Sequence, residues 1–166
     1  MAIHIAPLSD ADPQAVEALL DLAFGTDRHG RTAYRIREGT AAIPALSFSA
    51  FDGDVLVGSL QSWPAQVDGV LVVLVGPVAV MPGRQRVGIG RMLMDALVEA
   101  APRDPMTMIG DPEYYGRFFG FTADATGGWD VPGPVERRRL LARNADGLPL
   151  NGALGPRIFA LATPSA

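Results

Sequence analysis

The chain contains no cysteine, which excludes disulfide bonds, thiolate metal sites and cysteine nucleophiles. Histidine is nearly absent as well, and His4 and His29 are too few for a histidine-rich metal centre. The first residues lack the basic region and the apolar run of a signal peptide. The apolar run Val70–Met81 is too short to cross a membrane as a helix, and Gly76-Pro77 interrupts it. We therefore expect a cytoplasmic protein with no metal and no membrane partner.

An excess of positive charge is also missing. The 166 residues carry a formal net charge of −4, which argues against nucleic acid as a partner. Hydrophobic residues make up 48% of the chain and charged residues 19%, the balance of a folded protein and not of a disordered one. At this length, and with no internal repeat or linker, we expect residues 1–166 to form one domain.

In the first half of the chain, apolar periodicity and turn residues predict strands and helices. Asp12 and Pro13 suit the N-cap and first position of a helix, and Gly25 suits its end. Asp52-Gly53-Asp54 is a hairpin turn between two strands of an antiparallel meander. The predicted elements are a strand over Ala2–Ala6, a helix between Pro13 and Gly25, a basic helix over about Asp27–Glu38, and strands over Ala45–Phe51, over Val55–Trp63 and from Val70 onward.

In the second half, a helix over Val87–Ala101 leads to a buried strand over Met106–Ile109. A crossover helix makes this strand parallel to the last strand of the meander. A short helix starts at Asp111-Pro112 and ends near Gly120. For the rest we predict loops at Gly127-Gly128 and Pro132–Pro134, a strand over Arg137–Arg143, a final strand over Arg157–Leu161, and a solvated basic run at Glu136–Arg139.

The segment Gly83–Arg91 is a glycine- and arginine-rich turn between a buried strand and a helix. Backbone N–H groups at a helix start bind anions, so we expect a phosphorylated ligand here. A nucleotide-binding P-loop requires lysine where Ile89 stands, and a dinucleotide-binding loop requires glycine where Leu93 stands. The pattern that remains is Gln/Arg-x-x-Gly-x-Gly/Ala, which fits residues 85–90.

With Gln85-Arg86-Val87-Gly88-Ile89-Gly90, the chain resembles the GNAT N-acetyltransferase superfamily, in its small bacterial single-domain branch. The lead-in Gly76–Pro82 and the later segment Gly110–Phe121 strengthen the resemblance, which covers about three quarters of the chain, from Ile3 to Phe121. It implies an α/β fold of one domain. Its central sheet would be mixed and mostly antiparallel, with about six or seven strands, a splayed fourth strand and about four flanking helices.

The resemblance also implies acetyl-CoA as cosubstrate and acetyl transfer to a primary amine. Glycines at 88 and 90 let phosphate oxygens approach the backbone, and Arg84, Arg86 and Arg91 add positive charge. Pro77 breaks its strand ladder, so the pantetheine arm would pair with the strand after it, where an amide would polarise the thioester carbonyl. The cosubstrate residues are then Val78, Ala79, Val80, Gln85, Arg86, Val87, Gly88, Ile89, Gly90 and Arg91.

A tyrosine before the Gly-Phe segment often protonates the departing thiolate in this superfamily, and we assign Tyr115 to this role, with Tyr114 second. This chain has Phe118-Phe119 where related sequences have one phenylalanine. Counting back from Gly120 therefore gives Gly116 as the tyrosine position, whereas counting forward from Gly110 gives the tyrosines. The general base stays open among Glu38, Asp111 and Glu113. Trp63 and Trp129 could line an acceptor pocket, but we expect them to pack in the core.

Two other functions stay open at this point. The fold could bind coenzyme A without catalysis, or it could be an interaction domain whose basic helix at Asp27–Glu38 docks an acidic partner. The same helix could instead face an acidic acceptor or be a solvated face. The resemblance makes a homodimer plausible, and the acceptor amine is not specified.

Overall fold

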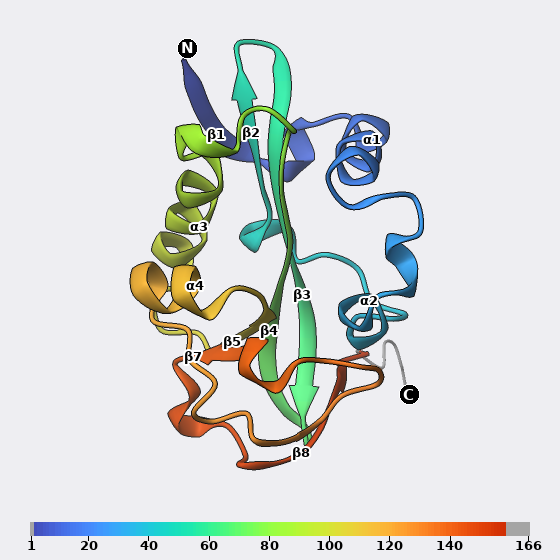
Figure 1. The fold of residues 1–166 in the computed structure, drawn as a ribbon, viewed down its shortest axis with the longest axis vertical. Coiled ribbons are helices and arrows are strands. Elements are labelled where there is room, and N and C mark those ends of the chain that lie inside the picture. Colours follow the sequence, from blue (N-terminus) through green and yellow to red (C-terminus); the bar gives the residue numbers. More distant parts are fainter. Residues whose placement is uncertain (1, 159–166) are drawn as a thin grey trace, which may run out of the picture. The chain divides into compact units, whose positions relative to one another are not determined.

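The computed structural model describes residues 2–158, which form eight strands and four α-helices (Figure 1). The strands are β1 (Ile3–Pro7), β2 (Phe48–Asp52), β3 (Val55–Val67), β4 (Val70–Val80), β5 (Met106–Ile109), β6 (Gly128–Asp130), β7 (Leu140–Arg143) and β8 (Asn151–Pro156). The helices are α1 (Pro13–Phe24), α2 (Thr32–Ile36), α3 (Ile89–Ala100) and α4 (Pro112–Phe119). Within the described residues no helix is both long and apolar enough to span a membrane.

The strands form a mixed and mostly antiparallel sheet in the order β1-β2-β3-β4-β5-β7, and β8 pairs with both β3 and β6. The pairs β1–β2, β2–β3, β3–β8 and β5–β7 are antiparallel, whereas β4–β5 and β6–β8 are parallel. The predicted α/β class, the meander and the parallel crossover to β5 are therefore confirmed. The eight strands of residues 2–158 exceed the six or seven that were predicted, because β6 and β8 lie in the C-terminal segment.

The chain packs as two compact units, which are described separately below. The first contains residues 2–30, 42–62 and 75–103, and the second contains residues 31–41, 63–74 and 104–158. Strands β3 and β4 contribute residues to both units. That the whole chain is one domain stays a prediction.

In the first unit, α3 packs directly on β3. The closest approach is at Gly58, where a Cβ atom would lie 2.8 Å from Cγ2 of Ile89 and 3.1 Å from Cδ1 of Leu93. Ile89, Leu93 and Leu97 of α3 are completely buried, and each such side chain contributes about 1.5–3 kcal/mol by leaving water. The first turn of α3 is therefore anchored by its own core residue, Ile89.

Helix α1, also in the first unit, begins as its sequence predicts. The side chain of Asp12 accepts a hydrogen bond from the N–H of Gln14 at 3.2 Å, and Pro13 occupies the first helical position. Its apolar face packs beside the end of β4 in one buried cluster, which contains Ala11, Val16, Leu19, Leu20 and Ala79. Helix α1 and the end of β4 thus share one core.

The core of the second unit surrounds Trp129, which is completely buried on β6. Its indole N–H donates to the carbonyl oxygen of Pro149 at 2.8 Å, so the one polar group of the ring is satisfied. Trp63 is half-buried against the same cluster. Core packing, the expected role of both tryptophans, is confirmed for Trp129.

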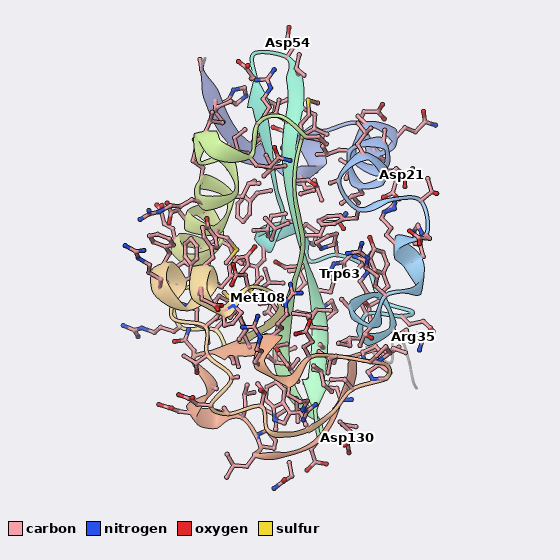
Figure 2. All side chains as sticks on the ribbon, in the orientation of Figure 1. Asp21, Arg35, Asp54, Trp63, Met108 and Asp130 are labelled. Carbon is pink, nitrogen blue, oxygen red and sulfur yellow. The ribbon has the colours of Figure 1, made fainter. Side chains whose placement is uncertain are left out.

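The basic helix predicted over Asp27–Glu38 is wrong in its extent. A short 3-10 turn, Arg28–Gly30, precedes α2, which covers only Thr32–Ile36. Arg28 is buried, with 2% of its surface exposed, and its guanidinium pairs with Glu17 at 2.5 Å and Asp21 at 3.1 Å (Figure 2 labels Asp21). The predicted helix is therefore divided at the turn that contains Arg28. Because Arg28 is buried, the expectation that this segment is a solvated face is wrong for this residue.

Three predicted strands also differ. The strand predicted over Ala45–Phe51 begins at Phe48, because Pro44–Leu46 forms a 3-10 turn closed by the Ser47 hydroxyl, which donates to the carbonyl of Ile43. The strand predicted over Arg137–Arg143 begins at Leu140, after another 3-10 turn. The final strand is β8 and not Arg157–Leu161, of which residues 159–161 lie outside the described residues.

The strand predicted over Val55–Trp63 continues to Val67. Gly128 lies in β6 and not in a loop, because its bare Cα permits close pairing with β8. A Cβ atom at Gly128 would collide with Oδ1 of Asn151 and with the carbonyl oxygen of Leu150. Strand packing therefore requires glycine at position 128, whereas Gly127 lies in a turn, as predicted.

Candidate functional site

The end of β4, in the first unit, supplies the strand part of the predicted cosubstrate site. Ala79 is buried, whereas Val78 and Val80 are half-buried. Just past the strand, the N–H of Met81 donates to the carbonyl of Val57 at 2.8 Å, which ties this end of β4 to β3. The backbone of Val78–Val80 is therefore held in an extended form.

The pairing of β4 with β5 joins Val73 to Met106 and Leu74 to Thr107, and it ends before Gly76-Pro77. Pro77 has no N–H to donate, and the peptide bond before it is cis. Among the described residues, the pairs between β4 and β5 do not extend to Val78–Val80.

The turn that follows β4 is closed by its own hydrogen bonds. The N–H of Arg84 donates to the carbonyl of Met81 at 3.0 Å, and the N–H of Gly83 donates to Oε1 of Gln85 at 2.8 Å. Residues 85–87 then form a 3-10 turn. Gln85, a predicted cosubstrate residue, thus shapes the loop through its side chain, while Val87 is exposed.

Helix α3 starts at Ile89 and not at Val87, because Gly88 adopts the left-handed conformation, with φ of 82°. No side chain caps this helix, whereas an aspartate caps both α1 and α4. The N–H groups of Ile89 and Gly90 point out of the first turn, where the helix dipole is positive. The start of α3 therefore presents backbone N–H groups at the positive end of a helix dipole, and the binding of a phosphorylated ligand there stays a prediction.

Not all of the predicted positive charge faces this site. Nη1 of Arg84 lies 2.5 Å from Oδ2 of Asp52, and this hydrogen bond lowers the pKa of the Asp52 carboxyl below its ordinary value of 3.8. Arg91 is exposed on α3, and for Arg86 the structure describes only the backbone. The sequence analysis missed Asp52, which lies 32 residues before Arg84 and shares no local pattern with it.

The Asp52–Arg84 pair has a testable dependence on pH. Since the pKa of Asp52 is lower in the folded protein than in the unfolded chain, the pair stabilises the fold above about pH 4, and this contribution disappears as the pH falls through the folded pKa. We expect Asp52→Asn to lower the melting temperature at pH 7 but not near pH 2. Melting curves over this range are the measurement. Asp54→Asn, in the same hairpin (Figure 2), is the control, because no side chain that the structure describes forms an ion pair with Asp54. Equal behaviour of the two variants would contradict the assignment.

Helix α4, in the second unit, carries the two candidate tyrosines. Its start is fixed by Asp111, which accepts from the N–H of Glu113 at 3.0 Å, and its end by Gly120, which is left-handed with φ of 72°. The edge of the Tyr114 ring meets Tyr115, with centroids 4.9 Å apart. Tyr115 also contacts the rings of Phe119 and Phe121.

The Tyr115 hydroxyl keeps its proton over the physiological pH range. Burial, assisted by the nearby Tyr114 and Asp111, raises the pKa of its hydroxyl to about 12. Among the groups that the structure describes, none forms a hydrogen bond with this hydroxyl. It is therefore protonated at neutral pH, with its proton uncommitted within the described chain.

Which of the two counts gives the catalytic position stays a prediction. A Cβ atom at Gly116 would lie 3.1 Å from the carbonyl oxygen of Phe121, which is a tight contact with the turn that follows α4. The two phenylalanines differ in burial, because Phe119 is buried and Phe118 is exposed. One of the two phenylalanines therefore lies at the surface, and the assignment of Tyr115 stays a prediction.

The candidate bases have other contacts or high exposure. Asp111 caps α4, and hydrogen bonds from the side chain and backbone of Glu113 lower the pKa of Asp111, which weakens it as a base. Glu113 is exposed beside Arg138, and Glu38 is exposed. Within residues 2–158, no group of three or more His, Cys, Asp or Glu side chains could hold a metal ion.

The basic residues near α2 bind neighbouring groups of the second unit. Nη1 of Arg35 (Figure 2) donates to the carbonyl of Pro132 at 3.1 Å. The guanidinium of Arg37 lies between two rings, 3.9 Å from the centroids of both Tyr34 and Trp63. This segment is therefore tied into its unit by polar and cation–π contacts.

Known proteins resemble this chain in sequence and in fold. Residues 14–109 match the family described as acetyltransferase (GNAT). No curated protein matches. Among solved structures, the GNAT family N-acetyltransferase YhbS from Escherichia coli in complex with CoA is 24% identical over 94% of this chain and 89% of its own, with a TM-score of 0.67.

Two further solved structures share the fold. A GNAT family acetyltransferase from Brucella melitensis in complex with acetyl-CoA is 23% identical, covering 94% of this chain and 96% of its own, with a TM-score of 0.63. Naa50 from Arabidopsis thaliana, in complex with the bisubstrate analogue CoA-Ac-MVNAL, is 14% identical, covering 86% and 99%, with a TM-score of 0.54.

Proposed function

The chain belongs to the acetyltransferase (GNAT) family, and from this premise we propose that it transfers the acetyl group of acetyl-CoA to a primary amine. The observation that carries the proposal is the start of α3, which no side chain caps and which follows a left-handed Gly88. The solved relatives from Escherichia coli and Brucella melitensis, bound to CoA and acetyl-CoA, support the choice of cosubstrate.

In this proposal the N–H groups of Ile89 and Gly90 bind the pyrophosphate, and Arg86 and Arg91 add positive charge. Gln85 and Val87 belong to the 3-10 turn that brings the chain to this helix start. The pantetheine arm pairs with the backbone of Val78–Val80. One amide of that strand polarises the thioester carbonyl.

The reaction is a direct transfer. The neutral amine nitrogen attacks the thioester carbonyl carbon, and the carbon–sulfur bond then breaks. The departing thiolate takes the proton of the Tyr115 hydroxyl, and the acetylated nitrogen loses its proton to solvent or to a base. Burial of the Tyr115 ring and its uncommitted hydroxyl support this role, with Tyr114 as the second candidate.

Binding of acetyl-CoA is tested by thermal unfolding. A ligand that binds only the folded state stabilises it by about 2.7 kcal/mol at a concentration 100 times its Kd, which corresponds to a rise of roughly 5–10 °C. We expect such a rise with acetyl-CoA and a much smaller one in Arg86→Glu, since reversing this charge repels the phosphates. No shift at millimolar acetyl-CoA would refute the proposal. An equal shift in Arg86→Glu would mean that the loop is not the phosphate site.

The acceptor is found by screening small amines, amino acids, aminoglycosides and peptides for release of free CoA thiol. The absence of lysine and cysteine from the chain keeps the background low, because self-acetylation on those side chains is impossible. Binding of acetyl-CoA without thiol release for any amine would favour the non-catalytic alternative. A cytoplasmic location and a homodimer are further parts of the proposal.

A further inference from the structure

The residue just after β5 lies against the ring of Tyr115. A Cβ atom at Gly110 would lie 2.9 Å from both Cδ2 and Cε2 of this ring, and 3.3 Å from Cε of Met108. Any larger residue at position 110 would therefore push the ring aside. The backbone of Gly110 does not need glycine, because its φ is not among the positive values. The close contact with Tyr115 is thus the structural reason for glycine at this position.

Gly110 is itself held by Arg139. The N–H of Gly110 donates to the carbonyl of Arg139 at 3.0 Å, and Nε of Arg139 donates back to the carbonyl of Gly110 at 3.2 Å. These two bonds join positions 29 residues apart and fix both backbone groups of Gly110. The Arg139 side chain is half-buried at this contact.

The neighbouring arginines make different contacts, so hydrogen bonding to Gly110 is not a general property of the basic run. Nη2 of Arg137 contacts the carbonyl oxygens of Thr126, Gly127 and Trp129 at 3.3, 3.0 and 2.6 Å. Arg138 is exposed, and its contact with Glu113 is 3.4 Å long between two exposed side chains. Glu136, Arg137 and Arg138 are exposed, as predicted for this run, whereas Arg139 is half-buried.

We propose that Gly110 and Arg139 are positioning residues that fix the ring of Tyr115, and thereby the place from which its hydroxyl delivers a proton. This inference rests on the proposed function, because it presumes that Tyr115 is the acid. Gly110 acts by direct contact with the ring, and Arg139 acts through Gly110. A displacement of about 1 Å at a reacting group can cost 100-fold in rate, so small movements of the ring matter.

Arg139→Met keeps the aliphatic stem and removes the donor to Gly110, and Gly110→Ala adds the one carbon that meets the ring. Both variants are expected to lower kcat by about 10- to 100-fold, with an unchanged KM for acetyl-CoA. Arg139→Lys, which can still donate to the carbonyl, should recover part of the loss. Arg138→Met is the matched control and should keep the parent kcat, because its side chain is exposed. Melting temperatures with acetyl-CoA show whether each variant is folded.

The decisive measurement is a double-mutant cycle with Tyr115→Phe. If Arg139 acts through the Tyr115 hydroxyl, adding Arg139→Met to Tyr115→Phe costs no further kcat. Additive losses, or an unchanged kcat in folded Arg139→Met and Gly110→Ala, would overturn the inference while leaving Tyr115 as the acid. An unchanged kcat in Tyr115→Phe alone would instead refute the acid assignment, and the inference with it. If Gly110→Ala does not fold, the cycle with Arg139→Met decides.

Discussion

Tyr115→Phe is expected to lower kcat by about 100-fold or more while leaving the KM for acetyl-CoA nearly unchanged. The substitution removes only the hydroxyl, since the ring contacts with Tyr114, Phe119 and Phe121 are made by carbon atoms. Without a proton donor, the thiolate must leave as an anion or take its proton from water. Steady-state kinetics with an accepted amine is the measurement, and equilibrium binding of CoA confirms that the cosubstrate site is intact.

The dependence of the rate on pH provides a second test of Tyr115. An acid must be protonated to act, and the pKa of Tyr115 is raised to about 12 by burial. We therefore expect no decline of kcat between pH 7 and about pH 10 from loss of this proton. A descending limb near pH 8 to 9 that is lost in Tyr115→Phe would contradict the burial effect.

Tyr114→Phe separates the two tyrosines. Tyr114 is half-buried, and its ring contacts Phe118, which is exposed. If Tyr115 is the acid, the loss of kcat in Tyr115→Phe should exceed that in Tyr114→Phe by at least tenfold. The reverse order would assign the proton to Tyr114.

The parts of the fold that could be predicted depend on residues that are close together in the sequence. The Asp-Pro pairs at positions 12 and 111 begin helices because the carboxylate, the missing N–H and the first turn all lie within three residues. The hairpin turn at Asp52–Asp54 and the end of α4 at Gly120 follow from equally short patterns. The glycine spacing at 88 and 90 located the start of α3 to within two residues.

The parts that were missed depend on partners far along the chain. Arg28 shortens the predicted helix because it pairs with carboxylates 11 and 7 residues before it. Gly128 looks like a loop residue until β8 approaches it. In the first unit Arg84 is bound by Asp52, and in the second unit Gly110 is bound by Arg139, at separations of 32 and 29 residues. No local periodicity encodes such pairs. The sequence could therefore nominate the loop and the tyrosines as candidates, but it could not predict the residues that hold them.

Gly88→Ala is expected to weaken binding of CoA by about 10- to 100-fold, the cost of one or two charge-assisted hydrogen bonds. Gly88 has φ of 82°, and an alanine there either bears roughly 1–2 kcal/mol of strain or rotates the first amides of α3 away from the phosphates. The added carbon meets no other atom within 4 Å, so the loss would come from backbone direction and not from collision within the protein. Calorimetric titration with CoA is the measurement.

Gly90→Ala is the matched comparison, because the same carbon is added two residues later on ordinary helical backbone. A Cβ atom at Gly90 would lie 3.7 Å from Cγ2 of Val80, which is a normal contact, and alanine should stabilise the helix by about 0.5–1 kcal/mol. The loop motif also admits alanine at this position. We therefore expect a slightly higher melting temperature and a loss of CoA affinity of less than about threefold. Similar losses of CoA affinity in both variants would mean that any added side-chain volume near the helix start weakens binding. The loss in Gly88→Ala alone would show that the left-handed turn directs the amides toward the ligand.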